Sequence, residues 1–269
     1  MKKVICLLLV LVMAAGAMLV FTSCGSKDQT TLVCGVTEYD PMNFRDSNGN
    51  WTGFDTEFAL LVGDKLGMEV TFQEIEWSNK FVELDAGAID AIWNGFTATA
   101  NEADGTPRIT LCDMSYSYML NTQCVVVRAD RLGEFGSIEA LLGKTIAVES
   151  GSAGEVKALE LVGPSGNTIG AAAQINTLLE VMSGAADGAV IDLILAQELT
   201  GQGDYSALTV AGNIELGDEV FAIGFKTGSP LRDRINGAMV ELYNDGTLRQ
   251  LAQKYGVDNR LYVDQTFGR

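Results

Sequence analysis

Charged side chains carry most of the chemistry open to this sequence, because it contains no histidine. The absence excludes Ser-His-Asp and Cys-His nucleophile systems, histidine-ligated zinc and a histidine pH switch. Acidic residues outnumber basic ones by 35 to 18, which gives a formal net charge of −17. A nucleic acid is therefore disfavoured as a partner, since binding to a phosphate backbone needs clustered cations.

Cysteines are the other reactive residues, and the chain has five of them. Cys6 and Cys24 lie in and just after the apolar N-terminal segment. Cys34, Cys112 and Cys124 lie in apolar stretches, where a free cysteine behaves as a small buried hydrophobe. An odd number does not make a complete disulfide framework, although one disulfide among these three stays open.

Residues 1–23 are predicted to be a signal peptide, because Lys2 and Lys3 precede an almost wholly apolar segment. The stretch Phe21-Thr22-Ser23-Cys24-Gly25 resembles a bacterial lipobox, in which cleavage leaves a lipidated cysteine, here Cys24. An ordinary secretory peptide with an incidental cysteine is the alternative. Residues 24–31 would then tether the protein to the extracytoplasmic face of a bacterial membrane. Loss of the two lysines changes the formal charge to −19.

The elements that must position the functional groups alternate between short apolar strands and amphipathic helices. Strands are expected at 32–36, 70–75, 88–93, 145–148, 189–191 and 220–225. Helices are expected at 54–66, 79–86, 175–182, 192–199, 230–244 and 247–255. In the first helix the apolar residues follow helical spacing, Asp55 is a candidate N-cap and Gly67 a stop. This alternation predicts an α/β architecture with mainly parallel sheets.

Several motifs share the order and spacing of a known family. They are Gly53-Phe54-Asp55, Gly87-Ala88-Ile89-Asp90, Gly95-Phe96-Thr97-Ala98-Thr99, Arg108 seven residues before Ser115, Gly143-Lys144-Thr145-Ile146-Ala147-Val148 with Ser150-Gly151-Ser152, Gly184-Ala185-Ala186-Asp187 with Asp192, and Asp245-Gly246-Thr247-Leu248. Over residues 32–256 the chain resembles the amino-acid-binding proteins of ABC importers, the family 3 solute-binding proteins.

The resemblance implies the type II periplasmic-binding-protein fold. Two Rossmann-like α/β lobes are joined by two hinge strands, with the ligand in the cleft between them. Lobe 1 is expected at 30–125 plus 224–269 and lobe 2 at 126–223, with candidate crossing strands at 124–128 and 221–226. The implied function is a monomeric, non-enzymatic receptor that closes on an amino acid and delivers it to an ABC transporter permease in the membrane. No cofactor and no metal are expected.

The same resemblance assigns the ends of the amino acid. Arg108 would grip the α-carboxylate, for which a guanidinium offers a bidentate fork. Asp192 would bind the α-ammonium, although its place at a helix start also fits an N-cap. Residues 100–107 lengthen the family interval before Arg108; they could bulge outward and leave Arg108 in place, or change the mouth of the cleft.

Further candidate ligand-binding residues come from both lobes. Ser152 and the N–H of Ala153 lie at a helix start, which favours an anion, while Ser152 also fits a plain cap. Trp77 and Tyr39 could sandwich the ligand side chain, or be core aromatics. Three other residues complete this set: Gly95, Thr97 and Asn94.

Glu149 and Glu38 are the candidate determinants of side-chain specificity. Two acids beside aromatic rings suit a basic or polar amino acid and disfavour an acidic one, although a surface position is the ordinary interpretation of a glutamate. An enzyme resembling cyclohexadienyl dehydratases is an alternative, with Glu149 or Glu38 as the acid for prephenate or arogenate. A ligand-sensing or adhesive surface lipoprotein is a third possibility.

Overall fold

The computed structural model describes residues 30–268. The predicted signal peptide, the predicted lipidation site Cys24 and most of the predicted tether lie outside these residues. Thr31 already belongs to the first strand, so the tether predicted over 24–31 overlaps the folded domain at its end. Across residues 30–268, no helix has the length and apolar character needed to cross a membrane.

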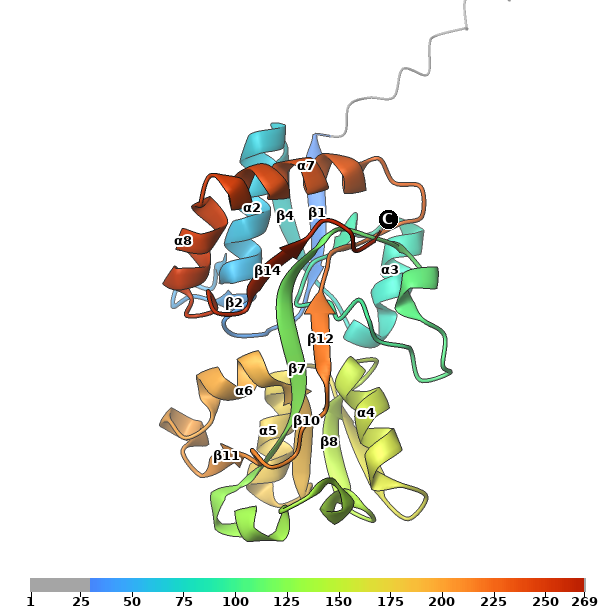
Figure 1. Cartoon of the computed structure of the whole chain (residues 1–269), viewed down its shortest axis with the longest axis vertical. Coiled ribbons are helices and arrows are strands. Elements are labelled where there is room, and N and C mark those ends of the chain that lie inside the picture. The colour runs from blue at the N-terminus through green and yellow to red at the C-terminus, as the bar shows by residue number, and fades with distance from the viewer. Residues whose placement is uncertain (1–29, 269) are drawn as a thin grey trace, which may run out of the picture. The chain divides into compact units, whose positions relative to one another are not determined.

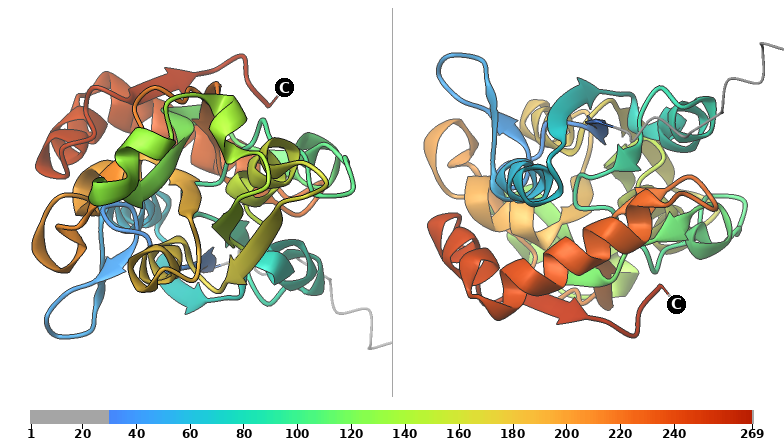
Figure 2. Two further views of the ribbon diagram at one scale, coloured as in Figure 1. Left: turned by 90° about the horizontal axis from the view of Figure 1, so that it is seen from below. Right: turned by 90° about the horizontal axis from the view of Figure 1, so that it is seen from above.

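The first lobe is built on a five-stranded sheet. Its strands lie in the order β4 (Glu69–Glu74), β1 (Thr31–Val36), β5 (Ala91–Ile92), β13 (Gly224–Phe225) and β6 (Asp113–Met114). A small hairpin of β2 (Phe44–Arg45) and β3 (Trp51–Thr52) adjoins it. Its helices are α2 (Phe54–Leu66), α3 (Lys80–Ala86), α7 (Leu231–Asn244) and α8 (Thr247–Lys254). In the right view of Figure 2, α7 crosses the outer side of this lobe and leads into α8.

The second lobe is built on a sheet with the order β11 (Leu208–Val210), β7 (Ser117–Arg128), β10 (Gly188–Asp192), β8 (Thr145–Glu149) and β9 (Asn167–Ala171). The helices α4 (Ala153–Val162), α5 (Gln174–Ser183) and α6 (Leu193–Leu199) pack on it (Figure 1). The prediction of two α/β lobes is therefore confirmed.

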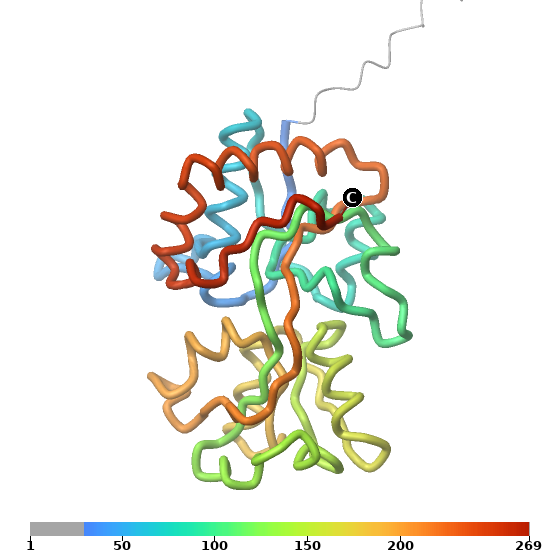
Figure 3. Tube along the Cα trace, viewed as in Figure 1, coloured from blue at the N-terminus to red at the C-terminus, as the bar shows by residue number. Residues whose placement is uncertain are grey.

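Two strands run between the lobes, as Figure 3 shows for the green and orange segments. The C-terminal half of β7 pairs with β10 and β11, while its N-terminal half pairs with β12 (Asp218–Phe221) and β14 (Leu261–Asp264). The crossing therefore lies at β12 and the paired residues 119–122. The predicted crossings at 124–128 and 221–226 come too late along the chain, because residues 124–128 pair with strands of the second lobe and residues 224–225 belong to the sheet of the first; Phe221 is the one residue of the second range that lies on β12.

Both sheets are mixed rather than mainly parallel. The pairs β1–β4, β1–β5, β8–β9 and β8–β10 are parallel, as the alternation of strands and helices predicts. The pairs β13–β5, β13–β6, β10–β7 and β11–β7 are antiparallel. Each antiparallel pair contains β7 or β13. These two strands continue from the crossing segments, so they enter their lobe from the hinge and run opposite to the parallel strands of its βαβ units.

The helix expected at 54–66 is α2, and its ends show why the sequence places it there. Gly67 ends it with φ 65°, a left-handed conformation that favours glycine. The N-cap is Gly53 rather than the expected Asp55. The buried Asp55 carboxylate instead accepts hydrogen bonds from the Gly95 N–H at 2.7 Å and the Tyr118 hydroxyl at 2.9 Å. Asp55 thus holds the loop that follows β5.

All three cysteines in the described part of the chain are buried and carry free thiols. Cys34 and Cys124 pack in the main apolar core, and Cys112 packs beside Met114 in a smaller cluster. Burial raises the pKa of the Cys112 thiol to about 12. These cysteines therefore act as small apolar side chains, as expected for free cysteines in apolar stretches.

Candidate functional site

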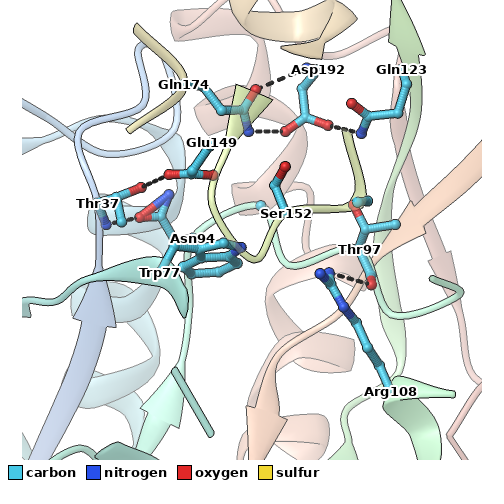
Figure 4. A pocket seen from close by; sticks show the side chains of 12 residues that line it. Thr37, Trp77, Asn94, Thr97, Arg108, Gln123, Glu149, Ser152, Gln174 and Asp192 are labelled. Atoms are coloured by element: carbon cyan, nitrogen blue, oxygen red, sulfur yellow. Dashed lines mark hydrogen bonds between the residues drawn. The ribbon is translucent and has the colours of Figure 1, made fainter. Parts of the chain in front are cut away.

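A small polar cavity lies between the lobes. The first lobe lines it with Thr37, Trp77, Asn94, Gly95, Thr97 and Arg108, and the rest of its wall is formed by Gln123, Glu149, Ser152, Ala153, Gln174 and Asp192 (Figure 4). Most of these residues end or follow strands β1, β5, β8 and β10. Parallel α/β sheets gather ligands at the carboxyl ends of their strands, which accounts for this position.

Arg108 is buried in the cavity wall, on a 3₁₀ turn (Arg108–Thr110). The residues inserted before it fold back on themselves, since the Arg108 N–H donates to the Ala100 carbonyl at 3.1 Å. The insertion therefore leaves Arg108 in the cleft. Its Nη1 donates to the Thr97 carbonyl at 3.1 Å and its Nη2 to the Gly151 carbonyl at 3.0 Å. Each Nη keeps one further N–H, and the two together can form a fork for a carboxylate.

Asp192 lies in the cavity wall, and in the view of Figure 4 Ser152 is drawn between Asp192 and Arg108. It occupies the N-cap position of α6, yet its side chain makes no capping hydrogen bond. Its carboxylate instead accepts from the Gln123 Nε2 at 2.6 Å and from the Gln174 Nε2 at 2.5 Å. Burial raises the pKa of Asp192, and these amide donors oppose the rise. The amides fix an acceptor suited to an ammonium group.

Glu149 ends β8 and is the least compensated charge in the cavity. Its side chain is buried, and its one hydrogen bond within residues 30–268 comes from the Thr37 hydroxyl at 3.4 Å. Burial and then the Asp192 charge raise the pKa of Glu149 to about 8. A cationic group placed beside Glu149 would favour its ionised form.

Ser152 and Ala153 begin α4 and face the cavity. The Ser152 hydroxyl accepts from the Glu155 N–H at 3.0 Å, so Ser152 is an N-cap as well as a lining residue. Gly95 and Thr97 line the same space, on the loop that Asp55 holds. A helix start beside a guanidinium is a favourable environment for a carboxylate.

The two aromatic candidates take different positions. Trp77 lines the cavity and packs edge-on against Phe96. Tyr39 is fully buried behind Gly95, edge-on to Phe221, and does not line the cavity. The expected sandwich of two rings is therefore absent from the cavity wall, because Gly95 and its loop lie over the Tyr39 ring.

Glu38 is exposed and lies outside the cavity, contrary to its place among the predicted site residues. It lines a hollow at the cleft mouth, together with Glu74, Glu76 and Glu83. Thr37 lines both this hollow and the inner cavity, so the two adjoin. The entrance on this side is therefore strongly acidic.

Sequence reasoning missed Thr37, Gln123 and Gln174, and also the nearby Glu219. Glu219 lies on β12, and its carboxylate accepts from the Gln123 Nε2 at 2.9 Å. Burial, followed by the Asp192 charge, raises the pKa of Glu219 to about 7. One signal was available: Gln123 and Glu219 each lie in a short run of polar residues that directly precedes an apolar stretch.

The charges around the cavity do not balance. Asp192 and Glu149 line the cavity and Glu219 lies beside it, and burial raises the pKa of all three; Arg108 lines the cavity, with Lys80 bound to the same Gly151 carbonyl. The described part of the chain has no group of three or more potential ligands arranged for a metal ion.

Comparisons with known proteins agree with this architecture. The arginine-binding extracellular protein ArtP of Bacillus subtilis is 28% identical over 92% of this chain and 96% of its own. The probable amino-acid-binding protein YxeM of the same organism is 33% identical, covering 91% and 93% of the two chains. An ancestral arginine-binding protein solved with arginine superposes with a TM-score of 0.76 at 26% identity, over 84% of this chain and 98% of that one.

The family itself is shown by a model that matches most of the chain. The model of the bacterial extracellular solute-binding proteins, family 3, matches residues 32–258. That range contains the crossing strand β12, every residue that lines the cavity, and both lobes except the C-terminal strand β14. The chain therefore belongs to the bacterial extracellular solute-binding proteins of family 3.

Proposed function

We propose that this protein is a receptor that captures a basic amino acid outside the membrane and presents it to an ABC transporter permease. The observation that carries the proposal is the arrangement of three ionisable groups around one cavity between the lobes. Arg108 offers two free N–H groups to an α-carboxylate, and Asp192 offers a fixed acceptor to an α-ammonium. Glu149 is left for a cationic side chain.

Two further observations support a basic ligand. The hollow at the cleft mouth is lined by four glutamates, whose potential attracts cations to the entrance. The names of two similar proteins, ArtP and the ancestral protein, specify arginine. An acidic amino acid would place a second carboxylate close to Glu149 and Asp192, which repel it.

The experiment is a calorimetric titration of the mature protein with each of the twenty amino acids. We expect L-arginine or L-lysine to bind most tightly and L-glutamate to bind weakly. In Arg108→Ala the affinity should fall by about 2–5 kcal/mol, since a buried ion pair loses one partner. Arg234→Ala is the matched control, because Arg234 is exposed on α7. Wild-type affinity in Arg108→Ala would refute the site assignment.

The proposal includes membrane attachment through Cys24. Lipidation would keep the receptor beside its permease and would use the polar residues after Cys24 as the tether. Labelling of cells with a radioactive fatty acid tests this step. We expect label in the wild type and none in Cys24→Ser.

The dehydratase hypothesis retains Glu149 alone as its acid, since Glu38 lies outside the cavity. A pKa of about 8 keeps Glu149 protonated at neutral pH, which a general acid requires. Incubation with prephenate and arogenate separates the two functions. Turnover that Glu149→Gln abolishes would favour the enzyme. Binding of amino acids without turnover favours the receptor, and neither activity would favour the surface-lipoprotein alternative.

A further inference from the structure

The segment inserted before Arg108, residues 100–107, forms a closed hairpin. Asn101 and Pro107 face each other as a β-bridge, and the Glu102 N–H donates to the Thr106 carbonyl at 2.9 Å. The Asp104 carboxylate accepts from the Thr106 N–H at 2.9 Å and so stabilises the turn. This geometry fixes the position of Glu102 relative to Arg108.

Glu102 bridges two buried cations. Its Oε1 accepts from the Arg108 Nε at 2.7 Å, and its Oε2 accepts from the Lys80 Nζ at 3.1 Å. The Lys80 and Arg108 side chains are 0% and 1% exposed. Burial and the Arg108 charge lower the pKa of Lys80 to about 8, and Glu102 opposes this change. Without Glu102, two adjacent buried cations would lose the carboxylate that pairs with both.

Lys80 and Arg108 also donate hydrogen bonds to the same carbonyl oxygen on the opposite side of the cleft. The Gly151 carbonyl, which lies between β8 and α4 in the second lobe, accepts from the Lys80 Nζ at 2.9 Å and the Arg108 Nη2 at 3.0 Å. The lobes approach closely here, since a Cβ on Gly151 would lie 2.7 Å from the Ser78 Cα. The cluster thus joins the carboxylate-binding end of the cavity to the contact between the lobes.

On the basis of the proposed function, we propose that Glu102 is a positioning residue for ligand binding. By holding the Nε edge of Arg108, Glu102 turns the two Nη groups toward the ligand carboxylate and toward Gly151. By pairing with Lys80, it keeps a second cation beside the same carbonyl. The three side chains together carry one net positive charge, which matches one carboxylate. The inserted hairpin thereby contributes to binding without lining the cavity.

The test compares Glu102→Gln with Asp104→Asn, which removes the same charge from the same hairpin without touching Arg108. Each variant is titrated with L-arginine and with L-argininamide, whose α-carboxylate is replaced by a neutral amide. We expect Glu102→Gln to weaken L-arginine binding about tenfold, the effect of one charge-assisted hydrogen bond, and to change argininamide binding by less than about threefold. Asp104→Asn should leave both affinities unchanged.

Equal weakening of the two ligands would show a general effect on folding and would overturn the proposal. Unchanged or tighter arginine binding in Glu102→Gln would also overturn it, because Glu102 would then be neutral or a competitor of the ligand.

A second readout does not depend on the ligand. The Arg108 Nε–H proton is followed through its ¹H–¹⁵N resonance, which is assigned by its loss in Arg108→Lys. This proton should be protected from exchange with solvent in the wild type and in Asp104→Asn. It should be exposed in Glu102→Gln, and protection that persists there refutes the proposal. A wild type that binds no amino acid refutes the proposed function instead, and the Nε–H resonance still decides whether Glu102 holds Arg108.

Discussion

Replacing Glu149 by glutamine tests the proposed selectivity for a cationic side chain most directly. The Glu149 side chain is buried in the cavity and accepts a single hydrogen bond, from Thr37, within the described residues. L-Arginine and L-citrulline are a matched ligand pair, since citrulline has nearly the same shape with a neutral side chain. The wild type should prefer arginine, and Glu149→Gln should bind the two within about threefold of each other, because the buried carboxylate that discriminates between them is gone.

The size of the preference follows from two opposing free energies. A buried charge that lacks its partner costs about 2–5 kcal/mol. Against this, Glu149 has a pKa of about 8, so at pH 7 its ionisation costs about 1.4 kcal/mol. The net preference of the wild type for arginine is then about 0.6–3.6 kcal/mol, or roughly 3- to 450-fold.

The same pKa gives this preference a pH dependence of known sign. Glu149 is mainly protonated below its pKa, and only the ionised form attracts the cation, so the affinity for arginine should rise with pH. Between pH 6 and pH 7.5 the ionised fraction grows about 20-fold. Calorimetry across this range should show that rise for arginine in the wild type and lose it in Glu149→Gln. Arginine binding that is as tight in Glu149→Gln as in the wild type would refute the reasoning.

Two further predictions concern the ligand-free fold and the contact between the lobes. Burial raises the pKa of Asp55 and Glu219 to about 7 and that of Glu149 to about 8, so the folded protein binds more protons than the unfolded chain above pH 4. Stability should therefore fall as the pH rises toward 8, and a higher urea midpoint at pH 8 than at pH 5 would contradict this. Gly151→Ala should weaken ligand binding, because the new Cβ would collide with the facing lobe. Gly87→Ala is the matched control for backbone strain, since φ is 72° at Gly87 and 77° at Gly151, but the space around Gly87 is open. Equal ligand affinities of the two variants in calorimetry would refute the collision.

The local elements could be predicted because their signals lie within a few residues. The apolar spacing over 54–66 and the glycine at 67 define α2, and the helix expected at 230–244 begins one residue later as α7. Short apolar strands followed by polar residues likewise marked the ends of β8 and β10, where Glu149 and Asp192 lie. The antiparallel strand β7 was missed in its first half, since polar residues such as Asn121 and Gln123 interrupt its apolar pattern.

The sequence by itself determined the family and the α/β elements, and it predicted Arg108 and Asp192 as site residues, both of which line the cavity. These follow from local periodicity and from motifs whose order along the chain is visible in one sequence. Only the tertiary structure decided which other polar side chains form hydrogen bonds with these two residues. It brought Gln123 to Asp192 because β7 pairs with β10, and it brought Gln174 there from the start of α5.

Tertiary packing also decided the positions of four side chains whose type alone left the choice open. Tyr39 is covered by the loop that carries Gly95, so it packs in the core and not against a ligand. Glu38 points to the cleft mouth, while Glu149 is enclosed when the lobes meet. Glu102 pairs with Arg108 because a hairpin turns the chain back on itself. Contacts of this kind depend on distances in space, which the spacing of residues along the chain does not specify.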